Sequence, residues 1–287
     1  MPCGEAVRAF IGGMDSGAAC HAVTWRLRLD ESAPSGPRFS LDAQYGVPPP
    51  GNPNQMIDGP RVSLQGTLQA TTRAYTLTAG STRRALALTR ISNDLLHLQT
   101  STGALANGTA GWSYTLSRSN RTEQSGDPAT AADFSYQISP RSTGSDVFGV
   151  FEGRTPCRRI AQELNLGEVP GCIKVKWRVT LYQDSQSGAP ARYKIESTLH
   201  RQQPRGGTWR IAKSGAGQPG ATVYELAAAG KEAPILLMKG DDNVLFFLNQ
   251  QRQLLVGSVD FGYTLNRVTA PQLPAPKLAL VDRAKAR

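Results

Sequence analysis

The chain has 287 residues, 39% of them hydrophobic, with 29 glycines and 19 prolines, which is typical of short strands joined by many turns. The sequence contains no apolar run of about 18 residues, the length that a membrane-spanning helix requires. The net charge is +10, but the basic residues are dispersed, which favours a solvated basic surface over a nucleic-acid-binding patch.

An internal duplication organises the chain. Six residues recur at a constant offset of 149 positions: Leu105, Gly108, Tyr114, Thr115, Leu116 and Arg118 match Leu254, Gly257, Tyr263, Thr264, Leu265 and Arg267. Each copy of roughly 120 residues is long enough to bury a core. We therefore expect a first unit over residues 1–118, a linker over 119–146, a second unit over 147–267 and a basic, proline-containing tail over 268–287.

Each copy begins with two cysteines, Cys3 and Cys20 in the first and Cys157 and Cys172 in the second. An even number of cysteines, duplicated with the repeat, predicts two disulfides and an oxidising compartment. The sequence shows no signal peptide, so this prediction requires that a targeting segment was removed or omitted.

A short helix is predicted between the paired cysteines, because Ile160, Ala161 and Leu164 share one helical face, as do Val7 and Phe10 in the first copy. Such a helix, held by a disulfide, would cap one end of a small barrel. An apolar segment precedes Cys157 but has no counterpart before Cys3. We expect from this difference that the natural chain starts further upstream.

Strands with strict period two follow the second cysteine of each copy. Trp25 and Trp177 fall at the same place in these strands and are expected in the core. The other predicted strands cover residues 38–41, 66–68, 74–78 and 85–89 in the first copy, and 192–196, 207–209, 223–226 and 235–238 in the second. Residues 47–55 are expected to form an exposed loop, 134–138 an extra strand and 277–286 a short helix.

The end of each copy reads as a strand, a polar turn and a further strand, at residues 244–248, 249–253 and up to Leu265 in the second copy. Antiparallel strands at a spacing of about ten residues form sandwiches or barrels. We favour a mainly β protein of two tandem antiparallel barrels, because closure of a barrel removes its exposed edges.

Few residues indicate catalytic or metal chemistry. Cys20 and His21 are adjacent and could ligate Cu(I), but none of the three histidines recurs in the other copy. The sequence has neither a G-x-S-x-G nor an H-E-x-x-H motif. Residues 241–243 could hold a cation through oxygen atoms, although Gly-Asp-Asp-Asn more often forms a tight turn. No catalytic residue, metal site or cofactor is therefore predicted.

The second copy resembles the N-terminal barrel of the NlpE-like envelope lipoproteins, a family associated with copper resistance and surface sensing. The resemblance covers residues 148–267, and more faintly 2–118. It rests on residues 151–157 (FEGRTPC), the strand that follows Cys172, the extended pair at Tyr193, residues 207–209 (GTW) and the closing residues 263–265 (YTL). It implies a lipocalin-like barrel that a lipidated N-terminus attaches to the bacterial outer membrane.

The chain departs from this family at its cysteines, because fourteen residues separate Cys157 from Cys172 where the family has a compact C-x-x-C. A copper site built on C-x-x-C is therefore not implied, and the lipidation segment is absent from this chain. We expect a non-enzymatic envelope protein, periplasmic or secreted, that acts as a structural, binding or stress-sensing module. No nucleic-acid partner is expected. Its ligand and partners are not indicated.

Two alternatives remain open at this point. One is a lipocalin-like carrier of a small apolar ligand. A barrel filled by Trp177, Leu181, Phe246 and Phe261 would have no room for such a ligand. The other alternative is a copper-binding sensor.

Overall fold

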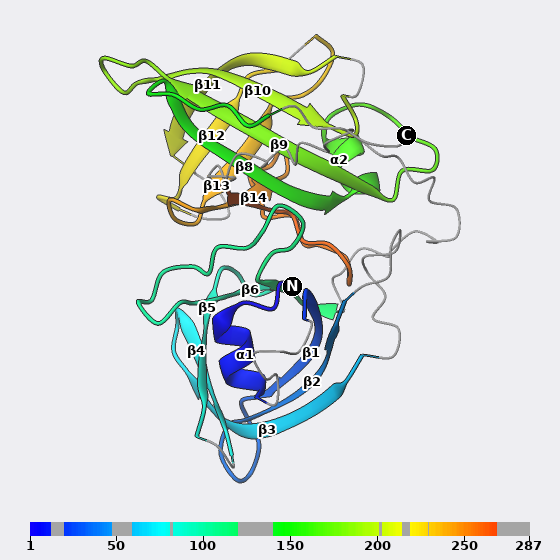
Figure 1. Cartoon of the computed structure of the whole chain (residues 1–287), viewed down its shortest axis with the longest axis vertical. Helices are drawn as coiled ribbons and strands as arrows, with labels where there is room; N and C mark the ends of the chain where they lie inside the picture. Colours follow the sequence, from blue (N-terminus) through cyan, green and yellow to red (C-terminus); the bar gives the residue numbers. More distant parts are fainter. Residues whose placement is uncertain are drawn as a thin grey trace, which may run out of the picture.

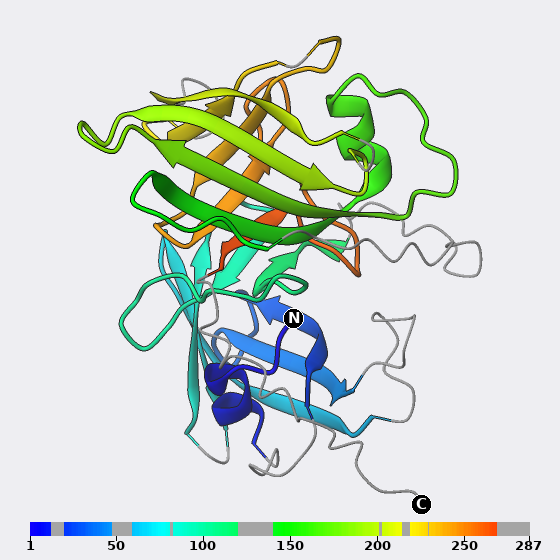
Figure 2. The same cartoon turned by 45° about the horizontal axis from the view of Figure 1, so that its top comes forward.

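The computed structural model describes residues 1–12, 20–47, 59–80, 83–119, 140–200, 203–213, 219–228 and 230–268. The predicted strand at 134–138, most of the loop at 47–55 and the predicted helix at 277–286 lie outside these ranges. The described residues form two β units that are stacked along the long axis of the molecule (Figures 1 and 2). Within the described part of the chain, neither helix is long and apolar enough to cross a membrane.

The first unit is an open antiparallel sheet that curls around one helix, α1 (Glu5–Ile11), as Figure 1 shows. Its strands are β1 (Ala22–Asp30), β2 (Arg38–Gly46), β3 (Arg61–Ala70), β4 (Ala74–Ala79), β5 (Ala85–Arg90), β6 (Leu95–Leu98) and β7 (Thr115–Ser117). They lie in the sheet in their order along the chain, so β1 and β7 are its two edges.

The second unit is a closed barrel of eight strands. Its elements are β8 (Val147–Pro156), α2 (Cys157–Glu163), β9 (Lys174–Gln183), β10 (Pro190–Ser197), β11 (Arg205–Lys213), β12 (Thr222–Leu226), β13 (Ile235–Lys239), β14 (Val244–Leu248) and β15 (Thr264–Arg267). The strand β8 closes the barrel, because it pairs with β9 on one side and with β15 on the other.

The prediction of a mainly β protein with barrel architecture is confirmed for the second unit and is wrong for the first. The first unit has counterparts of β9 to β15, but no described strand corresponds to β8. A barrel closes only when its first and last strands share a hydrogen-bonded neighbour or pair with each other. Without that strand, β1 and β7 stay apart as edges.

The helices and disulfides take equivalent places in the two units. The face of α1 buries Val7, Phe10 and Ile11 inside the curled sheet, with the Phe10 ring 6.4 Å from that of Trp25. In the barrel, α2 adds Ile160 and Leu164 to the interior cluster. The structure joins Cys3 to Cys20 and Cys157 to Cys172 in disulfides, so both helices are tied to the start of the next strand.

The two units contact each other through β12 to β15 of the barrel and the chain around β6 and β7. An apolar cluster fills this contact and consists of Leu105, Val223, Leu236, Met238, Val244, Phe246 and Leu248. Polar contacts surround it: the Leu105 N–H donates to Asp241 Oδ2 at 3.0 Å, and the Gly108 N–H donates to Asn266 Oδ1 at 2.8 Å. The expectation that Phe246 fills the barrel interior is therefore wrong, because its ring faces the first unit.

Two local predictions also need correction. Trp25 was expected in the core beside its counterpart Trp177, but it is partly exposed whereas Trp177 is 1% exposed. The final strand was expected to continue directly from the turn at 249–253. Residues 254–263 instead form an irregular segment that includes the isolated bridge Leu248 to Leu254, before β15 begins at Thr264.

Candidate functional site

The gap between the edges of β1 and β7, called the strand gap below, is the main structural difference between the two units. In the barrel, β8 occupies the corresponding place between β9 and β15. An unpaired strand edge presents a row of N–H and C=O groups that can pair with another extended segment. The strand gap has two such edges, and no strand of the described residues lies between them.

The first two residues pair with β1, and their register relates the strand gap to the position of β8 in the barrel. Met1 and Val23 exchange both backbone hydrogen bonds, at 2.8 and 2.9 Å, and Pro2 forms a bridge with Ala22. In the barrel, Thr155 and Pro156 pair with the equivalent residues of β9, Val175 and Lys174. Met1 therefore lies at the position of Thr155, and Pro2 at that of Pro156, the last residue of β8.

The backbone groups that face the strand gap follow from this register. In an antiparallel ladder the N–H and C=O of alternate residues point toward the same neighbour. Because those of Val23 point toward Met1, those of Trp25, Leu27 and Leu29 point into the strand gap. On the far side of β1 the ladder with β2 runs from Ala22 to Asp30.

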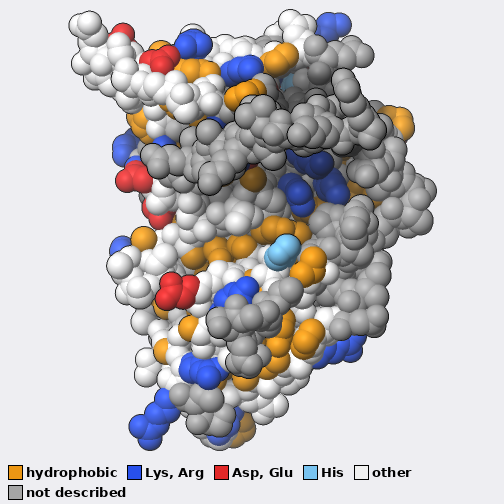
Figure 3. All heavy atoms as spheres, in the orientation of Figure 1, with side chains coloured by type: hydrophobic (Ala, Val, Ile, Leu, Met, Phe, Trp, Pro, Cys, Tyr) orange, Lys and Arg blue, Asp and Glu red, His pale blue; other side chains and the backbone are white. Residues whose placement is uncertain are grey.

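Apolar side chains beside the strand gap are less covered than their counterparts in the barrel. Trp177, Val179 and Leu181 of β9 are at most 1% exposed, whereas Trp25, Leu27 and Leu29 of β1 are only partly buried. Leu116 of β7 is also partly buried, and its counterpart Leu265 is 0% exposed. Figure 3 shows hydrophobic side chains at the surface of the first unit over the region of α1 and β1. One strand of the β8 type would cover both rows.

A polar atom beside the strand gap also lacks the partner that its counterpart has. The indole Nε1 of Trp177 donates to the hydroxyl of Thr155 on β8 at 2.9 Å. Among the residues that the structure describes, the buried Nε1 of Trp25 has no hydrogen-bond partner. The position of Thr155 is held by Met1, whose thioether is a weak acceptor. An unpaired buried donor costs about 1–3 kcal/mol, so the strand gap is also energetically incomplete.

The outward face of β8 carries an ion cluster that has no counterpart among the described residues of the first unit. Glu152 accepts hydrogen bonds from Arg178 Nε at 2.6 Å and from two Arg141 nitrogens at 3.0 and 2.9 Å. Burial by itself would raise the pKa of Glu152, but the hydrogen bonds from Arg141 and Arg178 outweigh burial and lower that pKa. Glu152 is therefore held as a carboxylate between two guanidinium groups.

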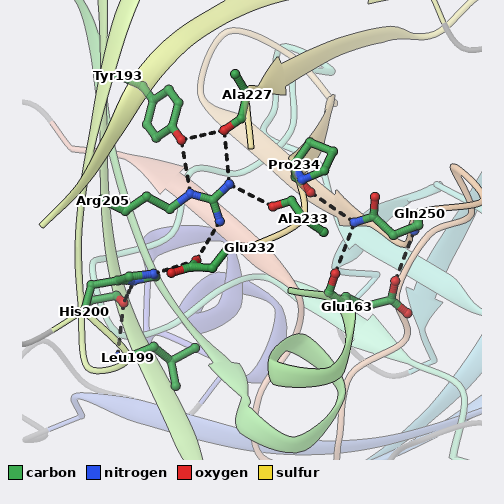
Figure 4. A network of polar contacts seen from close by, with 11 residues as sticks. Glu163, Tyr193, Leu199, His200, Arg205, Ala227, Glu232, Ala233, Pro234 and Gln250 are labelled. Atoms are coloured by element: carbon green, nitrogen blue, oxygen red, sulfur yellow. Dashed lines mark hydrogen bonds and ion pairs between the residues drawn. The ribbon is translucent and has the colours of Figure 1, made fainter. Parts of the chain in front are cut away.

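A second candidate is a polar network at the α2 end of the barrel, drawn in Figure 4. His200 lies between Ser197 and Glu232, with Nδ1 2.7 Å from Ser197 Oγ and Nε2 3.0 Å from Glu232 Oε2. A row of serine, histidine and glutamate can serve nucleophilic catalysis when a substrate can reach the serine. The sequence did not indicate this row, because the three residues belong to no motif.

The contacts of Ser197 indicate a structural role instead. Ser197 is 0% exposed, and its hydroxyl accepts the N–H of Leu199, the hydrogen bond of a turn. Glu232 also accepts from Arg205 Nη1 at 2.9 Å. A nucleophile must contact its substrate, so a covered hydroxyl that caps a turn does not support catalysis.

Arg205 is the centre of this network and has 1% of its side chain exposed. Its guanidinium donates to Glu232, to the Tyr193 hydroxyl and to the carbonyl oxygens of Ala227 and Ala233. A buried charge is tolerated when its donors are paired in this way. The network therefore ties the loop between β12 and β13 to β10 and β11.

The residues considered for metal binding are not brought together. All four cysteines are in disulfides, and His21, His97 and His200 lie at three different places. The described residues include no cluster of three or more His, Cys, Asp or Glu side chains suited to a metal ion. Asp241 instead forms the predicted turn, because its Oδ1 accepts the N–H groups of Asn243 and Val244 at 2.8 and 2.9 Å.

Comparisons with protein-family models, with curated proteins and with solved structures found no match to this chain.

Proposed function

We propose that the chain is a non-enzymatic binding module of the bacterial cell envelope, of the NlpE-like type, and that an extended polypeptide segment occupies the strand gap. The single observation that supports this function is the contrast between the two copies, one closed by β8 and the other open at the same place. Addition of a strand to a sheet edge is a common mode of peptide recognition.

The chemistry of the strand gap favours a polypeptide over other occupants. Both edges offer backbone N–H and C=O groups at the spacing of a β-ladder, and only another extended backbone pairs with all of them. Apolar side chains on alternate residues would cover Trp25, Leu27 and Leu29. A lipid or a small apolar molecule would cover these side chains but would leave the backbone groups unpaired.

The proposal also includes an extracytoplasmic location and a non-enzymatic role. Two disulfides are compatible with an extracytoplasmic location, where such bonds persist. The side chains inside the barrel, from Trp177 to Leu265, pack as one cluster around α2, so no observation favours the apolar-ligand carrier. Every cysteine is in a disulfide, so no observation favours a copper site built on thiolates.

Hydrogen exchange followed by mass spectrometry tests the strand gap directly. The probe is a capped synthetic peptide with the sequence of residues 147–154 (VFGVFEGR), added in excess to the full chain under oxidising conditions. We expect slower exchange in the segments that contain residues 24–29 and 115–118, because the amides of Trp25, Leu27 and Leu29 would enter a new ladder.

The matched control is the Leu27→Pro variant. Proline removes the Leu27 N–H, which points into the strand gap, and leaves the N–H groups that face β2 intact. We expect the variant to fold and to lose peptide protection. Unchanged exchange in the unmodified chain at millimolar peptide would contradict the proposed function, and so would protection confined to β9 and β15.

A further inference from the structure

We infer that Asn107 and Gly108 form a self-modification site, which the second unit keeps in the amide form and which converts when the two units separate. The modification is deamidation, the conversion of asparagine to aspartate or isoaspartate. These residues are the only Asn-Gly pair in the sequence. The inference does not depend on the strand gap, because it concerns the contact of β15 with the chain between β6 and β7.

The reaction needs water and no other reactant. The backbone nitrogen of Gly108 loses its proton and attacks Cγ of Asn107, so that a new C–N bond forms, the bond from Cγ to Nδ2 breaks and ammonia leaves. Water then opens the succinimide ring at one of its two carbonyl groups, which gives aspartate or isoaspartate. Glycine favours the attack, because it has no Cβ to crowd the ring and its backbone adopts many conformations.

Two consecutive residues of β15 hold the two reacting groups. The nucleophile, the Gly108 N–H, donates to Asn266 Oδ1 at 2.8 Å. The leaving group, Nδ2 of Asn107, donates to the Arg267 carbonyl at 2.9 Å. An amide oxygen stabilises the N–H and repels the nitrogen anion, and a carbonyl cannot supply the proton that the departing ammonia takes up. Attack therefore requires both hydrogen bonds to break, and both of them join the two units.

The side chain of Asn266 is fixed in the orientation that protects Gly108. Asn266 is 1% exposed, and its Nδ2 donates to the carbonyl oxygens of Thr109 and Trp112 at 3.3 and 3.5 Å. Carbonyl groups only accept, so Nδ2 faces them and Oδ1 faces the Gly108 N–H. The segment that contains Gly108 can leave this arrangement only by moving away from β15.

The fold requires the glycine of this pair but not the asparagine. A Cβ at Gly108 would collide with the Trp112 carbonyl oxygen and lie 2.8 Å from Asn266 Oδ1. The second copy also has glycine at this place, Gly257, but it has Val256 where the first copy has Asn107. Asn107 is exposed, so water can reach it and substitutions there leave the tight turn in place.

Deamidation would also weaken the contact that prevents it. The product places a carboxylate oxygen where Nδ2 of Asn107 now donates to the Arg267 carbonyl, so two acceptors would face each other. The guanidinium of Arg267 is already engaged, because it donates to the carbonyl oxygens of Asp242 and Phe148. Asp241, which accepts the Leu105 N–H, adds a negative charge on the same side. Each conversion therefore leaves a permanent record of unit separation.

Rates of deamidation, measured by peptide mapping and mass spectrometry, test this inference. The full chain is incubated under oxidising conditions at mildly alkaline pH, beside a capped peptide of residues 104–110 (ALANGTA). We expect Asn107 to convert about five- to thirtyfold more slowly in the folded chain than in the peptide, because two hydrogen bonds must break first.

Two variants separate the contact from global stability. Asn266→Ala removes the acceptor of the Gly108 N–H, and we expect it to raise the rate in the chain close to that of the peptide. The matched control is Trp177→Phe, which removes a buried hydrogen bond inside the barrel and leaves the contact with Gly108 in place. We expect this control to keep the slow rate.

A product mimic measures the consequence of the conversion. Asn107→Asp places the carboxylate at an exposed position, and Asn107→Ala removes the same hydrogen bond without adding charge. We expect faster hydrogen exchange in residues 104–109 for Asn107→Asp than for Asn107→Ala, with unchanged exchange in β9.

Each outcome supports or overturns the inference. Slow conversion in the original chain and in Trp177→Phe, with fast conversion in Asn266→Ala, supports it. Equal rates in the folded chain and in the peptide would overturn it. Equal acceleration by Trp177→Phe and Asn266→Ala would also overturn it, because global unfolding would then expose the pair. If Asn266→Ala does not fold, the comparison with the peptide and the exchange of Asn107→Asp still decide.

Discussion

The hydroxyl oxygens of Thr115 and Thr264 lie 2.9 Å apart, and these residues hold the same position in the two copies of the repeat. A second equivalent pair also meets, because the rings of His97 and Phe246 pack edge to face with centroids 5.7 Å apart. Equivalent residues contact each other only about a local twofold axis, as in an isologous dimer. The two units are therefore packed like the subunits of a homodimer within one chain.

The two copies differ in residue type at His97, where the second copy has Phe246. His97 is 0% exposed; its Nε2 is 2.9 Å from the Ala106 carbonyl and its Nδ1 is 2.9 Å from the Thr115 hydroxyl. A carbonyl can only accept, so Nε2 carries the proton and Nδ1 accepts from Thr115. The neutral ring thus completes a row of hydrogen bonds at the centre of the interface.

Acidification is expected to weaken the folded state through His97. Burial lowers the pKa of His97 from 6.5 to about 4. The unfolded chain therefore binds more protons than the folded chain between these values, so stability falls as the pH drops from about 6.5 toward 4. The limiting loss is about 3 kcal/mol. Urea unfolding at pH 7.5 and 4.5 measures this loss.

The His97→Phe variant is the control for this pH dependence. It copies Phe246 and removes the titrating ring, while all carboxylates stay the same. We expect the variant to lose less stability than the unmodified chain between pH 7.5 and 4.5. An equal loss in both proteins would show that His97 does not cause it.

The two equivalent tryptophans are expected to respond differently to the same substitution. Trp177→Phe removes a fully buried indole and leaves the Thr155 hydroxyl without its donor, so we expect a loss of about 1–3 kcal/mol. Trp25→Phe removes an unpaired donor from a partly exposed side chain and should change stability by less than about 1 kcal/mol. Urea unfolding of both variants checks this, and equal losses would contradict it.

Arg205 is expected to be essential for the α2 end of the barrel. Arg205→Leu leaves Glu232, the Tyr193 hydroxyl and two carbonyl groups without their donor, and we expect a loss of about 3–5 kcal/mol. Arg210→Leu, on an exposed arginine that pairs with Glu225, should cost less than about 1 kcal/mol. Thermal unfolding compares the two variants, and similar midpoints would refute the role of Arg205.

The disulfides are expected to stabilise both units to a similar degree. Replacing Cys157 and Cys172 by serine opens a loop with a sequence separation of 15 and should cost about 3 kcal/mol. The separation of 17 between Cys3 and Cys20 predicts a similar cost. Non-reducing peptide mapping must first find these two pairings, and cross-pairing between the units would exclude this account.

Part of the site could be read from the sequence, because it depends on comparing the two copies. The apolar segment before Cys157 has no counterpart before Cys3 in this sequence, and this segment forms β8, the strand that distinguishes the barrel from the open sheet. The sequence could not show that Trp25 would be partly exposed. Its pattern of alternation matches that of Trp177, and burial depends on the strand that lies across it.

The sequence by itself determined the duplication, the mainly β character and the positions of the two capping helices. These depend on period, on offset and on neighbours along the chain, which are local properties. Only the tertiary structure decided that one unit closes and the other stays open, that Phe246 meets His97, and that Arg205 joins Glu232. Each of these joins residues or strands that sequence patterns do not link, so none leaves a periodic signal in the sequence.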